Sequence, residues 1–151
     1  MAINPKDEVA KLAKVVHPIL IRLSGGRIGG TVAGMPVVIL TTTGRRSGKA
    51  RATPLTAIEH QGRTYVIASY GGDDRHPAWY LNLVDTPEVS VQREGRTEPM
   101  IARVLSPEER SEVWPVVTRT YDGYAGYQRR TDRPIPVVEL VPAPGGSPHR
   151  G

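Results

Sequence analysis

Two short hairpin signals within a series of apolar, β-branched stretches limit the fold of this chain more than any other feature. His60-Gln61-Gly62-Arg63 and Glu94-Gly95-Arg96-Thr97 each stand between two such stretches. A glycine in so short a connection is typical of a β-hairpin, because it accepts the positive φ angle of tight hairpin turns. The expected strands cover residues 37–43, 51–59, 64–69, 89–93, 98–105 and 134–141. The sequence therefore predicts about six antiparallel strands.

Two helical pieces are expected between the strands. One begins at Pro77, which suits a first helical turn, and runs to about Val84. The other begins with Ser106-Pro107-Glu108-Glu109, which supplies an N-cap, a first-turn proline and early acids. Because closure removes the exposed edges of an antiparallel sheet, we predict a mainly β (α+β) fold, a closed or split β-barrel with a few short helices. A doubly wound parallel sheet is disfavoured.

The 151 residues fit a single folded domain. We expect this barrel domain to span residues 36–141. Residues 1–35 would hold an amphipathic helix over 6–23, where apolar residues recur every three or four positions, and then a glycine-rich connection over 24–34. Residues 142–151 have no apolar content to bury, which predicts a disordered tail.

The residue types also narrow the chemistry. The chain has no cysteine, which excludes disulfides, thiolate metal sites and cysteine nucleophiles. Its four histidines are scattered and no H-E-x-x-H or serine-hydrolase motif is present, so no metal site is expected and a bound cofactor would carry any reaction. The N-terminus lacks a signal-peptide pattern, and no apolar run approaches the roughly 20 residues of a membrane span. We therefore expect a cytoplasmic protein.

Positive charge is concentrated in the segment GRRSGKAR, residues 44–51. The segment is not a P-loop, because only three residues separate its first glycine from the Gly-Lys pair, and a strand containing Pro54 follows. Its cations and amides, with the hydroxyls of Thr43 and Ser47, suit an anion, and the net charge of +5 agrees with an anionic partner. The alternative is a basic surface turn that binds nothing in particular.

The segment ASYGGDDRHPAWYLNL, residues 68–83, suits a flat ring. A strand ends in Ala68 and Ser69, and two glycines then allow the backbone to approach a ligand closely. The helix that follows offers Trp79 and Asn82. The alternative is a glycine turn before a core helix, with Trp79 buried in the core.

Three tyrosines, Tyr121, Tyr124 and Tyr127, recur every three residues and so share one side of a helical turn. Gly123 and Gly126 weaken a helix there. Three phenols on a pliable segment could line a substrate. The alternative is that they cover the edge of the core with their hydroxyls in water.

Taken together and in this order, the three segments resemble the deazaflavin-dependent nitroreductase family, small split-barrel oxidoreductases that use coenzyme F420. This cofactor is an 8-hydroxy-5-deazaflavin with a phosphate and an oligoglutamate tail. The matching segments are residues 40–55, 68–83 and 121–140. The resemblance implies an FMN-binding-like split barrel and an F420H2-dependent reductase that transfers a hydride to a quinone or nitroaromatic acceptor.

The resemblance also implies roles for individual residues. The phosphate and acidic tail would lie at Arg45, Arg46, Lys49 and Arg51, with Thr43, Ser47 and Pro54 beside them. The deazaflavin side of the cofactor would lie at Ala68, Ser69, Gly71, Gly72, Trp79 and Asn82. Tyr124 would orient the acceptor, with Tyr121 and Tyr127 closing over the reacting face and Ser69 polarising the acceptor.

Two positions depart from the family, and several alternatives stay open. Tyr70 stands where many relatives carry a basic or amide residue, and Leu81 replaces a common histidine, which puts the identity of the acceptor in question. The alternatives are an FMN-binding split barrel and a non-catalytic barrel that binds an anionic cofactor or nucleic acid. For partners we expect a small-molecule acceptor, no nucleic acid, and a homodimer as one option. The N-terminal helix would pack against the barrel or a second subunit, or contact an anionic membrane surface.

Overall fold

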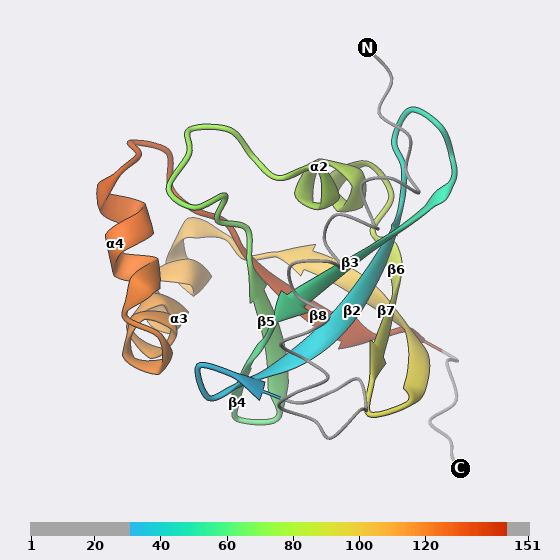
Figure 1. The fold of residues 1–151 in the computed structure, drawn as a ribbon, viewed down its shortest axis with the longest axis horizontal. Coiled ribbons are helices and arrows are strands. Elements are labelled where there is room, and N and C mark those ends of the chain that lie inside the picture. Colours follow the sequence, from blue (N-terminus) through green and yellow to red (C-terminus); the bar gives the residue numbers. More distant parts are fainter. Residues whose placement is uncertain (1–30, 145–151) are drawn as a thin grey trace.

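The computed structural model describes residues 31–144, which form one curled sheet with helices at its margins (Figure 1). The strands are β1 (Thr31–Val32), β2 (Met35–Thr43), β3 (Ala50–Thr56), β4 (Ile58–His60), β5 (Arg63–Ile67), β6 (Glu88–Arg93), β7 (Arg96–Val104) and β8 (Val137–Pro142). The helices are α2 (Ala78–Asp85), α3 (Pro107–Thr120) and α4 (Gly123–Arg129). The amphipathic helix expected over residues 6–23 lies outside the described residues.

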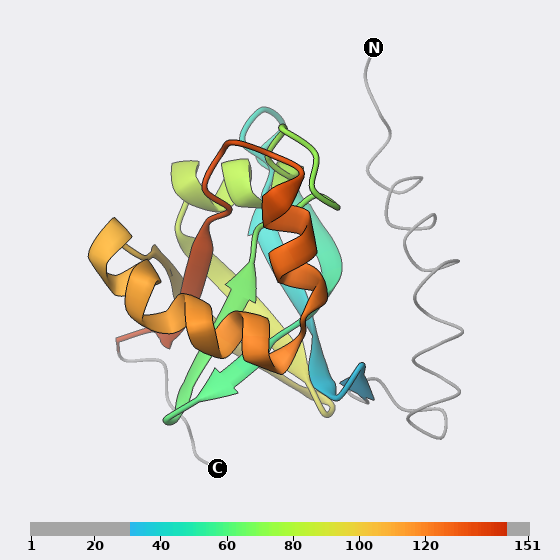
Figure 2. The same ribbon diagram turned by 90° about the vertical axis from the view of Figure 1, so that its left-hand side faces the viewer.

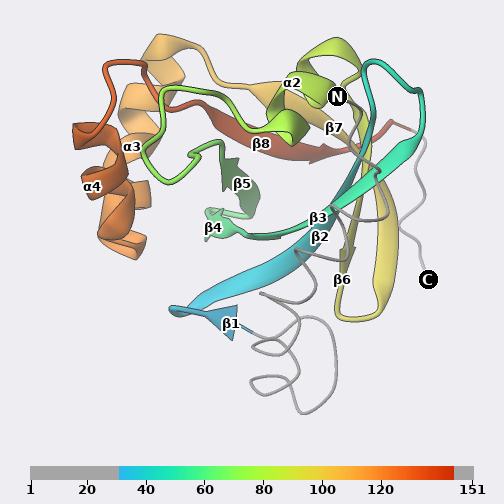
Figure 3. The same ribbon diagram turned by 45° about the horizontal axis from the view of Figure 1, so that its top comes forward.

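The sheet is antiparallel throughout. It is curled, and a single segment made of β3 and β4 pairs with strands near both of its ends. Its strands follow the order β1-β2-β6-β7-β8-β5-β4, and β3 also pairs with β2. Only Ala57 separates β3 from β4, and the Ala57 amide donates to the Pro36 carbonyl at 2.8 Å. Because β3 lies along β2 and β4 lies along β5, this segment joins opposite ends of the sheet (Figure 3). The expected split barrel is confirmed, and the parallel alternative is excluded.

Three of the hairpin turns have two consecutive residues with positive φ, as type I′ turns require. Gln61-Gly62 and Glu94-Gly95 have φ values of 53° and 75°, and 51° and 77°, which confirms both expected hairpins. The third, Ala33-Gly34, has φ values of 54° and 80° and joins β1 to β2. Here the sequence prediction was wrong: residues from Thr31 onward belong to the sheet and not to a flexible connection, because even the two-residue strand β1 pairs with β2.

Prolines decide where several strands begin and end. β8 begins at Val137 and not at Pro134, because the backbone of Pro134 and Pro136 cannot donate to a neighbouring strand. β8 also continues to Pro142, which lies opposite Met100, so the expected disordered tail does not begin at this residue. Pro54 is tolerated inside β3 because, among the strands of residues 31–144, that strand pairs only with β2.

Two hydrophobic cores lie on opposite faces of β5 and β8. Alternate residues of a strand point to opposite faces, so Val66 and Val138 face the barrel interior while Tyr65 and Val137 face outward. The interior core also receives residues of α2, and the outer core receives residues of α3 and α4. Figure 2 shows α3 and α4 side by side over one face of the sheet. The outer core thereby holds the tyrosine helix α4 against the barrel.

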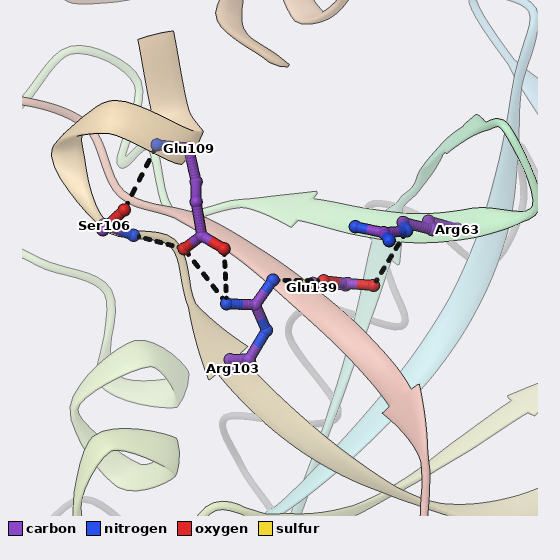
Figure 4. Close-up of polar contacts among 5 residues, drawn as sticks. All are labelled: Arg63, Arg103, Ser106, Glu109 and Glu139. Atoms are coloured by element: carbon purple, nitrogen blue, oxygen red, sulfur yellow. Dashed lines mark hydrogen bonds and ion pairs between the residues drawn. The ribbon is translucent and has the colours of Figure 1, made fainter. Parts of the chain in front are cut away.

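An ion-pair network fixes the start of α3 on the barrel (Figure 4). Ser106 forms the expected N-cap: its side chain accepts from the Glu109 amide, and Glu109 accepts from the Ser106 amide. Arg103 reaches Glu109 at 2.8 Å and Glu139 at 2.7 Å, and Arg63 lies 3.8 Å from Glu139. The hydrogen bond from the Ser106 amide, together with Arg103, holds the pKa of Glu109 below its usual range. The Glu109 carboxylate therefore caps α3 and contacts Arg103 of β7, and Arg103 in turn contacts Glu139 of β8.

Candidate active site

The connection between β2 and β3 is a tight turn that depends on glycine. The Gly44 amide donates to the Lys49 carbonyl at 2.8 Å, and the Gly48 amide donates to the Gly44 carbonyl at 2.7 Å. Gly48 has a φ of +71°, and a Cβ added at Gly44 would lie 2.6 Å from Ser47 Oγ. The positive φ at Gly48 and the limited space at Gly44 therefore favour glycine at both positions of this turn.

The cations of this turn are presented together at one end of the sheet. Arg45, Arg46 and Lys49 are exposed and Arg51 is half-buried. Within residues 31–144, no ion pair joins Arg45, Arg46 or Lys49 to an acid. Several like charges held close together favour an anion with several negative groups, since charge-assisted hydrogen bonds are the stronger ones.

Asn82 of α2 holds the cationic turn in place. It is buried, with 5% of its surface exposed. Its Oδ1 accepts from the amide and Nη1 of Arg45 at 3.1 and 3.3 Å, and its Nδ2 donates to Thr42 Oγ1 at 3.2 Å. Asn82 thus connects α2 with Thr42 near the end of β2 and fixes the position of Arg45 in the turn.

The tyrosine segment and the loop after β5 meet at a cavity of about 340 Å³. It is lined by Val32, Ala33, Met35, Pro54, Leu55, Thr56, Ile67, Ser69, Gly71, Tyr121, Tyr124 and Tyr127. Six of these residues were expected at the site from the sequence: Pro54, Ser69, Gly71 and the three tyrosines. The cavity therefore joins segments that lie far apart in the chain.

The three tyrosines pack edge to face and form one wall of the cavity. Their ring centroids are 5.2 Å apart for Tyr121 and Tyr124, 6.0 Å for Tyr124 and Tyr127, and 6.5 Å for Tyr121 and Tyr127. Residues 123–129 are helical despite two glycines, and a Cβ at Gly123 would lie 2.4 Å from the Tyr121 ring. Gly123 is therefore needed to let this ring fold across the start of α4.

Tyr124 contributes both to the core and to the cavity. It is 6% exposed, and its hydroxyl lies 3.1 Å from Thr56 Oγ1. Burial raises the pKa of the Tyr124 phenol above its usual value, although the hydrogen bond with Thr56 acts in the opposite direction. The phenol consequently stays protonated at neutral pH and can serve as a hydrogen-bond donor.

Arg133 fastens the loop after β5 to the segment after α4. Its Nε donates to the Asp73 carbonyl at 3.1 Å, and its Nη1 and Nη2 both reach the Ala68 carbonyl at 3.4 Å. Thr131 adds a hydrogen bond of 2.6 Å from its Oγ1 to Asp74 Oδ1. The two walls of the cavity, the Ser69 loop and the tyrosine helix, are thus held together at their base.

Gly72 allows the same two segments to approach each other closely. A Cβ at this residue would lie 2.9 Å from Arg130 Cβ and 3.1 Å from the Tyr127 carbonyl oxygen. Its φ of +84° also favours glycine. Gly72 therefore packs against the end of α4 but does not itself line the cavity.

The structure separates the expected site residues into three groups. The cavity holds six of them, and Ala68 and Gly72 lie behind its wall. The basic turn holds Arg45, Arg46, Ser47 and Lys49, with Thr43 at the end of β2 and Arg51 at the start of β3. Trp79 lies in the barrel core, which agrees with the alternative given for it, and Asn82 supports the turn. Neither of these two residues lines the cavity.

Sequence reasoning missed three residues of this arrangement. Thr56 could have been found, because it shares a face of β3 with Pro54 at the period of two of a strand. Thr131 and Arg133 lie in a segment without a regular pattern, and their partners are 57 and 65 residues away in sequence.

Strand β3 connects the basic turn with the cavity. Arg51 stands near its start, and Pro54, Leu55 and Thr56 at its end line the cavity. At about 3.3 Å per residue, the three residues from Arg51 to Pro54 span roughly 10 Å. A single molecule with a flat ring and an anionic tail can therefore contact both places.

No group of three or more potential metal-ligating side chains occurs among the described residues. No helix in residues 31–144 has the length and apolar character required to cross a bilayer.

Comparison with known proteins identifies the group to which this arrangement belongs. The family model described as F420H(2)-dependent quinone reductase matches residues 14–142. The chain belongs to this family. A relative from Mycobacterium tuberculosis that bears the name F420H(2)-dependent quinone reductase is 35% identical over 130 residues, which cover 83% of this chain and 87% of the relative.

Two solved structures support the assignment to the F420H2-dependent quinone reductase family. One, described as an F420-H2 dependent reductase (FDR-A), has 45% sequence identity and a TM-score of 0.63, and the match covers 69% of this chain and 92% of that one. The other, described as a domain-swapped dimer, has 38% identity and a TM-score of 0.64, with coverage of 91% and 99%. The resemblance to F420-dependent split-barrel oxidoreductases is confirmed.

Membership of the F420H2-dependent quinone reductase family makes the chain an oxidoreductase with coenzyme F420, as expected. The donor set of the structure fits this cofactor. A turn with several cations suits a phosphate and a carboxylate-rich tail, and a cavity walled by aromatic rings and a glycine suits a flat ring system.

Proposed function

We propose that this chain reduces a quinone with F420H2 and that the acceptor binds in the tyrosine-lined cavity. The observation that carries the proposal is the course of β3, which begins beside the cationic turn and ends in the cavity at Thr56. A cofactor held at the turn by its anionic tail would reach the cavity with its ring. The names of the relatives add support for a quinone as the acceptor.

The cofactor would be held by two sets of residues. Arg45, Arg46, Lys49 and Arg51 would receive the phosphate and the acidic tail, supported by Thr43 and Ser47. Pro54, Ser69 and Gly71 would lie against the deazaflavin ring, because they line the cavity. Four other residues would support the cofactor site without lining the cavity. Ala68 and Gly72 contact the segment around α4, Trp79 packs in the core, and Asn82 holds the basic turn.

The residues of the cavity would prepare the acceptor for reduction. Bound F420H2 supplies a hydride. Reduction of a quinone to its quinol takes a hydride, which carries two electrons, and one further proton, and negative charge develops on a quinone oxygen before that proton arrives. Tyr124 would donate a hydrogen bond to this oxygen, and Ser69, which is half-buried at the cavity, would be a second donor. Tyr121 and Tyr127 would cover the acceptor and exclude water.

A nitroaromatic compound is a second acceptor class that we propose for the same cavity. It is flat, and its nitro oxygens can accept from the same hydroxyl donors, Tyr124 and Ser69. Tyr70 is a residue that departs from the family pattern, and its side chain is 50% exposed beside Gly71, which lines the cavity. Because it stands beside the cavity and apart from the basic turn, it would affect the choice of acceptor more than the affinity for the cofactor.

The test of the proposed function separates the cofactor from the acceptor. The wild-type protein is titrated with F420 and with FMN by fluorescence, and then mixed with F420H2 and either a naphthoquinone or a nitroaromatic compound. We expect submicromolar binding of F420, no binding of FMN, and faster oxidation of F420H2 with the quinone. Binding of F420 without reduction of any quinone would contradict the proposed acceptor but not the cofactor site.

The role of the cationic turn is tested in the same titration. The triple substitution Arg45→Gln, Arg46→Gln, Lys49→Gln should weaken F420 binding by at least about tenfold, and added salt should weaken wild-type binding. Arg119→Gln is the matched control, since Arg119 is an exposed cation on α3. Unchanged affinity in the triple variant would contradict the assignment of the tail to this turn.

We also propose that the protein forms a homodimer. Support comes from the structure described as a domain-swapped dimer, which matches 91% of this chain at 38% identity. Analytical ultracentrifugation of the full chain checks this, and a concentration-independent monomer would contradict it. The expected membrane contact depends on residues 6–23 alone, and flotation with anionic vesicles tests it.

A further inference from the structure

The hydroxyl of Thr56 meets the hydroxyl of Tyr124 at the edge of the cavity. The two oxygens are 3.1 Å apart, and either can be the donor. Thr56 is the last residue of β3, and Tyr124 belongs to α4. Both residues line the cavity. Two hydroxyls in contact place one proton between their oxygens and leave the second proton free for another partner.

The position of the Tyr124 ring is fixed by its surroundings. Only 6% of its surface is exposed, and the rings of Tyr121 and Tyr127 meet it edge to face at 5.2 and 6.0 Å. A phenol proton prefers the plane of its ring, so it has two favoured directions. When Thr56 occupies one direction as a donor, the Tyr124 proton takes the other direction.

The phenol is the better of the two donors toward a developing negative charge. A phenol is far more acidic than the aliphatic hydroxyl of a threonine, and it therefore forms the stronger hydrogen bond to an oxygen that gains charge. A chain of hydrogen bonds also polarises its members in one direction. The order Thr56 to Tyr124 to acceptor uses both effects, whereas the reverse order would present the weaker donor to the acceptor.

We propose that Thr56 is a positioning residue, which donates its hydroxyl proton to Tyr124 Oη and so directs the Tyr124 proton at the acceptor oxygen. This inference rests on the proposed function for the acceptor, but the contact between the two hydroxyls is a feature of the fold itself. Thr56 then affects the rate of reduction through Tyr124 and has no part in holding the cofactor tail.

The first test measures the hydrogen bond in the protein without cofactor. Tyrosine labelled with ¹³C at Cζ reports the titration of each phenol by NMR, and Tyr124→Phe assigns the signal. Thr56→Val removes the donor at nearly constant volume and should raise the pKa of Tyr124, because Thr56 stabilises the phenolate. Thr56→Ser should leave it near the wild-type value. A pKa that falls or stays unchanged in Thr56→Val overturns the proposal, whatever the turnover shows.

The second test measures the reduction of a naphthoquinone by F420H2. We expect Thr56→Val to lower kcat by about tenfold with little change in the affinity for F420, and Thr56→Ser to restore most of the loss. In a Tyr124→Phe background, Thr56→Val should have almost no further effect, since Thr56 acts through the phenol. Equal losses in both backgrounds, or failure of serine to restore the rate, overturn the proposal. If the wild-type protein binds F420 but reduces no quinone, the proposed acceptor is contradicted. The pKa of Tyr124 in Thr56→Val then still tests whether Thr56 donates to the phenol.

Discussion

Arg133 Nη1 lies 3.1 Å from His76 Nδ1, at the base of the loop that carries Ser69 and Gly71 into the cavity. An arginine always donates, so His76 Nδ1 accepts and the ring is neutral at this nitrogen. Partial burial and the charge of Arg133 both hold the pKa of His76 below its usual value. The loop after β5 is therefore sensitive to protonation of one histidine.

The stability of the protein should fall as the pH drops below about 6.5, the ordinary pKa of histidine. Because the pKa of His76 is lower in the folded state, the unfolded state takes up a proton at a higher pH than the folded state does. The free energy of unfolding therefore decreases as the pH falls through that window. Above pH 6.5 both states are neutral and the effect vanishes. Thermal unfolding between pH 5 and 8 checks this against His76→Asn, which keeps an acceptor near Nδ1 but does not titrate. If both proteins lose the same stability on acidification, His76 is not the cause.

Arg133→Gln should release the loop after β5 from the segment after α4. The Ala68 and Asp73 carbonyls would lose their donors, at a cost of about 1–3 kcal/mol of stability. Because Ser69 follows Ala68 directly, we expect a larger KM for the acceptor, while the distant cationic turn still binds F420. The pKa of His76 should rise toward its ordinary value, as ¹H–¹⁵N NMR of the imidazole can show. A variant with unchanged acceptor KM and an unchanged His76 pKa would contradict this role.

Asn82→Ala should weaken the binding of F420 although Asn82 does not line the cavity. The substitution removes the acceptor of Arg45 and the donor to Thr42, and such losses at a buried site cost about 1–3 kcal/mol. The turn would then lose its fixed shape, and we expect F420 affinity to fall by about tenfold at an unchanged KM for the acceptor. A change in acceptor KM with intact F420 affinity would instead place Asn82 next to the acceptor. Fluorescence titration together with steady-state kinetics distinguishes the two.

Gly72→Ala should destabilise the protein more than Gly95→Ala. Both glycines have similar positive φ angles, +84° and +77°, so the backbone penalty of about 1–2 kcal/mol is shared. Only at Gly72 does the added Cβ meet other atoms, at 2.8–3.1 Å from Arg130 and Tyr127, which adds roughly 1–3 kcal/mol. Urea unfolding of the two variants measures the difference. Equal destabilisation would mean that the loop and α4 are not packed together at this place.

The sequence by itself determined those parts of the protein whose cause lies within a few residues. The turns at Gln61-Gly62 and Glu94-Gly95 and the N-cap at Ser106 were predicted, because turn angles and capping are local properties. The concentration of cations at residues 45–51 was visible for the same reason. The order of the three segments along the chain is itself enough to indicate the cofactor family.

The tertiary structure decided which of these residues lie together at the cavity. Thr56 meets Tyr124 across 68 residues, and Arg133 meets Ala68 across 65, and both contacts depend on how β3, β5 and β8 pair in the closed sheet. Trp79 and Asn82 of α2 were expected beside the cofactor ring, but Trp79 lies in the core and Asn82 contacts the basic turn. No local pattern specifies such contacts, because these side chains lie together only in the curled sheet, whose shape depends on the pairing of all of its strands.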